Sequence, residues 1–142
     1  MVTVARRPLL LGLLALAATP AFAAETAADF VRRLYASGKT PLSIYAPALR
    51  AEMVRDRGRD SNRLDFDWLS GGQDEPKIAG LRVVTLNTSG PDRATVQATF
   101  TNWGEARVRR FELVRLGGVW LIVDVHMSPE ALRLTKVLAT PT

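Results

Sequence analysis

The hydrophobic pattern of this chain changes once, and that change limits the folds available to it. Before residue 58 the apolar residues recur every three or four positions, which is the period of a helix buried on one side. From Leu81 onward they alternate with polar residues, which is the period of a strand with one buried face. Helices followed by consecutive strands predict an α+β fold, with the helices packed on one face of an antiparallel sheet.

Two helices are predicted in the first half of the chain. Thr26 can cap the first helix, whose apolar stripe includes Phe30 and Leu34, and Ser37-Gly38 ends it. The second helical stretch covers residues 42–57 and can be interrupted at Pro47. Residues 58–63 are polar and contain glycine, so they are predicted to form a loop.

Four consecutive strands are predicted next, over residues 81–88, 93–102, 106–116 and 119–126. In the third strand, regular alternation would place the apolar residues Val108 and Phe111 on opposite faces of the sheet. One extra residue would bring both to the inner face, so we expect a bulge near Arg109 and Arg110. A short terminal helix is expected from Ser128 to residue 138. The predicted architecture is therefore a curved four-stranded sheet that packs against the amino-terminal helices and carries a short C-terminal helix.

The first 23 residues have the composition of a secretory signal. Arg6 and Arg7 precede an apolar stretch that runs to Pro20, and the small-residue sequence Ala21-Phe22-Ala23 follows. We expect cleavage after Ala23, a single domain over residues 24–142, and a periplasmic or secreted location. The apolar stretch is short for a membrane span, so no stable membrane insertion is expected after cleavage. The chain has no cysteine, which excludes disulfides and a lipid-acceptor cysteine.

The charge of the chain does not indicate a nucleic-acid partner. The formal net charge is +5, and acidic residues are interleaved with the arginines of the second helix and the third strand. Mixed-sign spacing of this kind is typical of a solvated surface with local ion pairs, so no nucleic-acid binding is expected.

Several short segments resemble one family of exported bacterial proteins. A glycine turn followed by Trp120-x-Ile122-x-Asp124 resembles the closing strand of the nuclear transport factor two-like (cystatin-like) superfamily. Together with residues 28–35, 45–49 and 64–74, this strand makes the chain similar to the family called domain of unknown function 3828. The resemblance implies a cone-shaped fold, with a bent sheet wrapped over helices and a cavity at the wide end. That family has no established activity, so it supplies no catalytic residue.

The segment Asp65-Phe66-Asp67-Trp68 is the densest group of chemically active side chains. In an extended segment Asp65 and Asp67 share one face, and with Gln73 and Asp74 they can bind a cation, an amine or a sugar hydroxyl. The alternative is structural. Phe66 and Trp68 then fill the core, while the carboxylates cap turns or pair with arginines.

The last predicted strand places Trp120, Ile122, Asp124 and His126 on one face. In the fold that the resemblance implies, this face looks into the cone, where Asp124 could act as a general base. The alternative is that Asp124 bonds a helix start or an arginine near the rim. His126 is the only histidine, which excludes a multi-histidine metal site, and we expect neither a metal nor a cofactor.

The opposite face of that strand is wholly apolar. It is predicted to pair with a second copy of the chain or with an envelope protein, and the alternative is burial under the terminal helix. Its residues are Val119, Leu121, Val123 and Val125.

The sequence favours an exported, non-catalytic binding or interaction domain of the bacterial cell envelope. One alternative is a small pocket enzyme of the isomerase or hydrolase type, with Asp124 or Asp67 as base and Tyr35 or Tyr45 as hydrogen-bond donor. Another is an inhibitor or immunity-type protein of the envelope. The candidate ligand-binding residues are Tyr35, Asp65, Asp67, Trp68, Gln73, Asp74, Trp120 and Asp124.

Overall fold

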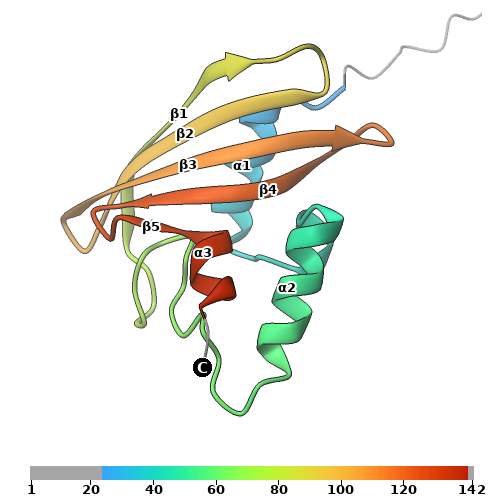
Figure 1. Ribbon diagram of the computed structural model, residues 1–142. Coiled ribbons are helices and arrows are strands. Elements are labelled where there is room, and N and C mark those ends of the chain that lie inside the picture. Colours follow the sequence, from blue (N-terminus) through green and yellow to red (C-terminus); the bar gives the residue numbers. More distant parts are fainter. Residues whose placement is uncertain (1–23, 141–142) are drawn as a thin grey trace, which may run out of the picture.

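The computed structural model describes residues 24–140, so the predicted leader lies outside the described residues. Figure 1 shows the strands in the upper part of the molecule, with α1 behind the sheet and α2 and α3 below it. The elements in chain order are α1 (Ala27–Ser37), η1 (Leu42–Ile44), α2 (Pro47–Arg57), β1 (Ile78–Thr88), β2 (Arg93–Asn102), β3 (Glu105–Leu116), β4 (Val119–Ser128), β5 (Leu132–Arg133) and α3 (Leu134–Ala139).

The first predicted helix is confirmed. The second begins at Pro47, five residues after the predicted start at residue 42. The side chain of Thr26 accepts a hydrogen bond from the backbone of Asp29, and Gly38 ends α1 in the left-handed conformation. Pro47 begins α2 and does not interrupt a longer helix, because proline lacks an N–H and costs nothing at a first helical position. Residues 42–44 before it form only one turn of 3₁₀ helix.

The sheet is antiparallel throughout, in the order β1-β2-β3-β4-β5. It has five strands where four were predicted. The fifth, β5, pairs with His126 and Met127 of β4. As a result, the terminal helix starts at Leu134, six residues later than the sequence predicted. A strand of two residues is too short to show the alternation of apolar and polar residues from which strands are predicted.

The bulge predicted near Arg109 is absent. The pairing of β2 with β3 is continuous from Arg93↔Val114 to Asn102↔Glu105. Arg109 therefore shares the inner face with Phe111, and Val108 points outward. The sequence prediction was wrong because it treated an arginine as an outward residue, whereas the folded chain supplies oxygen partners for a buried guanidinium.

The sheet is instead irregular in β4. Glu112 pairs with Asp124 and Leu113 pairs with Ile122, which leaves Val123 as an extra residue. Such a bulge exchanges the two faces of the strand beyond it. Trp120 and Ile122 face the core before the bulge, and Val125 and Met127 face it afterwards.

This bulge overturns both faces predicted for the last strand. Asp124 and His126 lie on the face opposite to Trp120 and Ile122. The four apolar residues 119, 121, 123 and 125 do not form one exposed face either, because Val125 is fully buried in the core and Leu121 is only 8% exposed. Self-association stays a prediction, and the four-residue surface proposed for it is not present.

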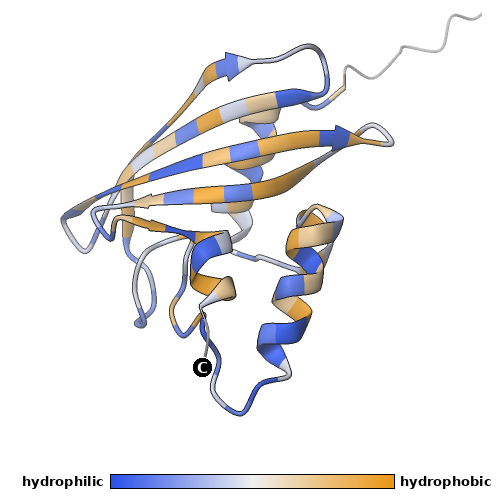
Figure 2. Cartoon of the chain, viewed as in Figure 1, coloured by the Kyte–Doolittle hydropathy of each residue, from blue (hydrophilic) through white to orange (hydrophobic). Residues whose placement is uncertain are grey.

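The concave side of the sheet is filled with side chains. Tyr35 of α1 packs against Phe100 and Phe111, with ring centroids 5.1 and 6.4 Å apart. Trp68, from the loop between α2 and β1, packs against Phe111 at 6.0 Å. In Figure 2 the strands carry alternating apolar and polar bands, as expected for a sheet with one buried face.

A buried arginine ties the α2–β1 loop to the sheet. Arg109 is 0% exposed, and its Nε donates to the carbonyl oxygen of Trp68 at 2.6 Å. Its Nη1 donates to the carbonyls of Val108 and Ser128, and its Nη2 lies 2.8 Å from a carboxylate oxygen of Glu130. Burial lowers the pKa of Arg109, and the charge of Glu130 opposes that shift. Removing one partner of such a buried pair typically costs about 3–5 kcal/mol.

Gly71 supplies a test of this contact. Its φ is +84°, and an added Cβ would lie 2.5 Å from Nη2 of Arg109. Gly38 is a matched control, because its φ is +64° and nothing lies within 4 Å of an added Cβ. We expect Gly38→Ala to cost about 1–2 kcal/mol of backbone strain. Gly71→Ala should cost roughly 2–4 kcal/mol, since it also displaces the guanidinium. Equal losses in denaturant unfolding would contradict the arrangement.

Candidate functional site

A polar hollow lies between the end of α1, the helix α2 and the first part of the α2–β1 loop. We call it the helix pocket, and its volume is about 330 Å³. In Figure 1, α2 and the first part of the loop that follows it lie in the lower part of the molecule, while α1 lies behind the sheet. The polar residues that line the pocket are Thr40, Tyr45, Asp56, Arg57, Asn62 and Asp67, together with the indole of Trp68.

Two hydrogen-bonded aromatic side chains form the buried part of the pocket. Trp68 Nε1 donates to the hydroxyl oxygen of Tyr45 at 3.0 Å, and both residues are at most 3% exposed. Burial raises the pKa of Tyr45, while the bond from Trp68 and the charge of Arg57 act the other way. The phenol therefore stays protonated at neutral pH, and its O–H can donate to a ligand.

The chain path at Tyr45 is fixed by the sheet. Tyr45 forms a parallel bridge with Ile122, and the N–H of Ala46 donates to the carbonyl of Ile122 at 2.8 Å. This contact covers the edge of β4 just before the bulge. The buried part of the helix pocket is thus anchored to the same strand that organises the core.

Two opposite charges at the pocket have no ionic partner of their own. Among the described residues, neither Arg57 nor Asp67 takes part in a salt bridge, although ten other pairs do. Asp67 accepts hydrogen bonds from the N–H of Leu69 and the hydroxyl of Ser70, which orient the carboxylate. A guanidinium and an oriented carboxylate beside a phenol can hold a small molecule that carries both acceptors and donors.

Asp56 builds one wall of the pocket. It is 3% exposed, and its carboxylate accepts the N–H groups of Arg63 and Leu64 at 2.7 and 3.1 Å. It also contacts Arg59 at 3.3 Å. These bonds stabilise the turn after α2. They also use the oxygen atoms of the Asp56 carboxylate, which are then not available to a ligand. Sequence analysis missed this role, because a carboxylate at a helix end gives no sign of the loop that it will hold.

The structure brings together only part of the predicted ligand set. Asp67 and Trp68 meet in the helix pocket, joined by Tyr45, the hydrogen-bond donor of the enzyme alternative. Trp68 is also a core residue, as its structural alternative predicted. Arg57 and Asn62 line the same pocket and were not predicted.

Other members of the set lie elsewhere. The hydroxyl of Tyr35 donates to the carbonyl of Leu69 inside the core, and burial raises its pKa strongly. Trp120 Nε1 donates to the carbonyl of Glu25 in a different hollow. Three of the four remaining residues, Asp65, Gln73 and Asp74, are exposed, and Asp65 lines a separate hollow beside α3.

Asp124 does not point into the cone. One oxygen accepts the N–H groups of Val125 and Thr135, at 2.9 and 3.0 Å, and the other accepts the hydroxyl of Thr135 at 2.9 Å. Arg133 Nε lies 3.4 Å away. Asp124 therefore holds the start of α3, which was the structural alternative, and it lies outside the helix pocket.

Of the groups named for the enzyme alternative, Asp67 and Tyr45 line the pocket, whereas Asp124 and Tyr35 do not. Asp56 is occupied by backbone N–H groups, and His126 lies on the outer face of the sheet. Within residues 24–140, the helix pocket contains no histidine and no hydroxyl nucleophile bonded to a base.

Comparisons with known proteins leave the family open. No family model matches the chain, and no curated protein matches it. Among solved structures, it is similar to a phospholipid-binding protein from Ralstonia solanacearum, solved in complex with a phospholipid, with 17% identity and a TM-score of 0.41. The match covers 78% of this chain and 59% of that chain. Such a similarity identifies neither the fold family nor the ligand of this chain. None of the described helices is long and apolar enough to span a membrane.

Proposed function

We propose that this chain is an exported, non-catalytic binding domain that holds a small polar molecule in the helix pocket. The observation that carries the proposal is that Arg57 and Asp67, which form no salt bridge with any residue of the part of the chain that the structure describes, line the same pocket as the Tyr45–Trp68 pair. A volume of about 330 Å³ is at the lower end of the range for small-molecule sites. An amino acid, an amine or a monosaccharide is of the size that such a pocket holds.

The family resemblance is retained as part of the proposal. Helices that precede an antiparallel sheet, with a helix-lined hollow outside the filled concave face, are compatible with a domain of the nuclear transport factor two-like type. What supports the family named domain of unknown function 3828 is the set of sequence segments around Trp120 and Asp67.

Export is the second part of the proposal, and it rests on the leader sequence. We expect the protein recovered from the periplasm of a Gram-negative host that expresses the whole chain to begin at Ala24, because Ala21-Phe22-Ala23 offers small residues to signal peptidase. N-terminal sequencing and intact mass measure this. A protein that stays in the cytoplasm and keeps residues 1–23 would contradict export and leave the pocket proposal standing.

The three tryptophans provide separate reporters for ligand binding. Trp68 lines the helix pocket, Trp120 lines another hollow, and Trp103 is 63% exposed on the β2–β3 turn. Titration with free amino acids, polyamines and monosaccharides should therefore shift the indole N–H signal of Trp68 in a ¹H–¹⁵N NMR spectrum and leave the other two in place. Shifts confined to Trp103 or Trp120 would show that the pocket is not the site.

A charge-removing variant tests the same site. Arg57→Gln should weaken binding of the compound that shifts Trp68 by roughly tenfold or more, because a charge-assisted hydrogen bond contributes about 1.5–3 kcal/mol. Arg55→Gln is the matched control, since Arg55 is on the same helix, pairs with Glu52 and does not line the pocket. Equal affinities for both variants would exclude Arg57 from the site.

A further inference from the structure

A cluster of metal-ligating side chains lies on the outer face of the sheet, outside the helix pocket. Glu112 of β3 and Asp124 and His126 of β4 each offer one ligand atom, and these atoms all lie within 4.8 Å of one another. The cluster exists because of the bulge at Val123, which turns Asp124 and His126 outward and sets Asp124 opposite Glu112. Two carboxylates and one imidazole, from two neighbouring strands, therefore lie close together.

The spacing of two of these atoms suits a metal ion. His126 Nε2 lies 3.1 Å from Glu112 Oε1. Ligands that bind Zn²⁺ at about 2.0–2.2 Å in tetrahedral or octahedral geometry lie roughly 3–3.5 Å from one another. This is the distance of a hydrogen bond between the two side chains, and a cation that replaced the shared proton could keep the two atoms at the same separation.

The third ligand is held in place by the protein. Asp124 is 3% exposed, and the backbone N–H and hydroxyl of Thr135 both donate to its carboxylate. Hydrogen bonds of this kind orient the carboxylate ligands of metal sites. The oxygen Oδ2 accepts one hydrogen bond, from Thr135, and its other contact is Arg133 at 3.4 Å. It therefore keeps a lone pair for a cation.

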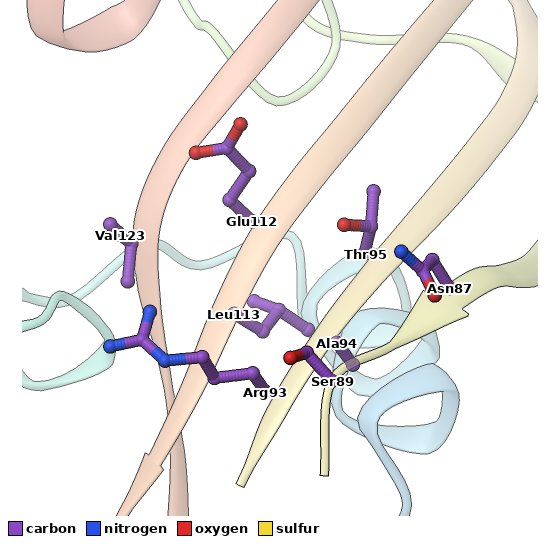
Figure 3. A pocket seen from close by; sticks show the side chains of 8 residues that line it. All are labelled: Asn87, Ser89, Arg93, Ala94, Thr95, Glu112, Leu113 and Val123. Carbon is purple, nitrogen blue, oxygen red and sulfur yellow. The ribbon is translucent and has the colours of Figure 1, made fainter.

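The cluster is open to solvent on one side. The side chains of His126 and Glu112 are 33% and 42% exposed. A hollow of about 220 Å³ lies beside Glu112 and is lined by Glu112 and Val123, but not by Asp124 or His126. In Figure 3 Glu112 projects from the sheet at one end of the hollow, and Arg93 lies at the other end with its guanidinium toward Val123. An ion bound by the three side chains would meet solvent past the exposed parts of Glu112 and His126, which leaves a position for water or an exchangeable ligand.

Two arginines oppose a cation at this position. Arg110 is paired with His126 across the strands, and Arg133 contacts Asp124. The Arg133 side chain is 44% exposed, and a surface ion pair of this kind contributes at most about 1 kcal/mol. A divalent cation, which carries twice the charge and lies nearer to the carboxylates, can displace it.

We propose that Glu112, Asp124 and His126 form a binding site for a divalent transition-metal ion of the Zn²⁺ type. Imidazole selects such ions over Ca²⁺ and Mg²⁺, and the two carboxylates balance the charge. The expectation of no metal rested on the single histidine. The exclusion of a multi-histidine site still holds, whereas the bulge overturns the placement of Asp124.

Titration calorimetry with ZnCl₂ tests the site, using chelator-treated protein without a polyhistidine tag. We expect one equivalent to bind, and His126→Ala and Glu112→Gln each to weaken binding at least tenfold. Both side chains are partly exposed, so neither substitution should prevent folding. Glu105→Gln is the matched control, because Glu105 is an exposed carboxylate of β3 outside the cluster, and it should leave affinity unchanged.

Arg133→Gln distinguishes a built site from adventitious binding to a surface histidine. Arg133 and Arg110 are both cross-strand partners of His126, but only Arg133 contacts Asp124. Arg133→Gln should therefore tighten Zn²⁺ binding several-fold and more than Arg110→Gln does, whereas binding to His126 alone would respond equally to the two substitutions. The proposal is overturned if no equivalent of Zn²⁺ binds, if Glu112→Gln binds as the unmodified protein does, or if Arg133→Gln leaves the affinity unchanged.

Discussion

The structure depends on one irregularity, the extra residue Val123 in β4. Up to Ile122 the strand presents its even-numbered residues to the core, and from Val125 it presents the odd-numbered ones. Three elements outside the β1–β4 pairing attach to this strand. Ala46 bonds the carbonyl of Ile122 and places the start of α2, Asp124 holds the start of α3, and β5 pairs with the strand's end. The bulge thus decides which side chains form the core and which reach the outer face.

The second constraint is the buried guanidinium of Arg109, which joins the helix pocket to the sheet. By donating to the carbonyl of Trp68, it fixes the loop that carries Asp67, and through Glu130 it fixes the turn between β4 and β5. A buried charge is costly unless its hydrogen bonds are made, so the loop and the turn are held together by the same requirement. The polar pocket and the packed core are therefore parts of one arrangement.

Local sequence signals predicted most of the helices and strands. The features that sequence analysis missed depend on pairing between residues that are distant in the chain. The cap at Thr26 and the turn at Gly38 marked α1, and strict alternation marked β2, because these features act within a few residues. The bulge at Val123 and the two-residue strand β5 depend on partners that are distant in sequence. Asp67, Trp68 and Tyr45 were named from composition, but nothing local indicated that Arg57 would reach them. The sequence could not reveal the outer cluster either, since strict alternation places Asp124 and His126 on the core face.

Cysteine labelling tests the bulge most directly, because the chain has no cysteine of its own. Val123→Cys and Val125→Cys are close in size to the original residues and lie two positions apart, so strict alternation would give them the same exposure. Val125 is 0% exposed, whereas Val123 lines a hollow on the outer face. We expect a thiol reagent to label the native protein at position 123 and to reach position 125 only after denaturation. Equal labelling rates at both positions in the native protein would contradict the bulge, and with it the outward placement of Asp124 and His126.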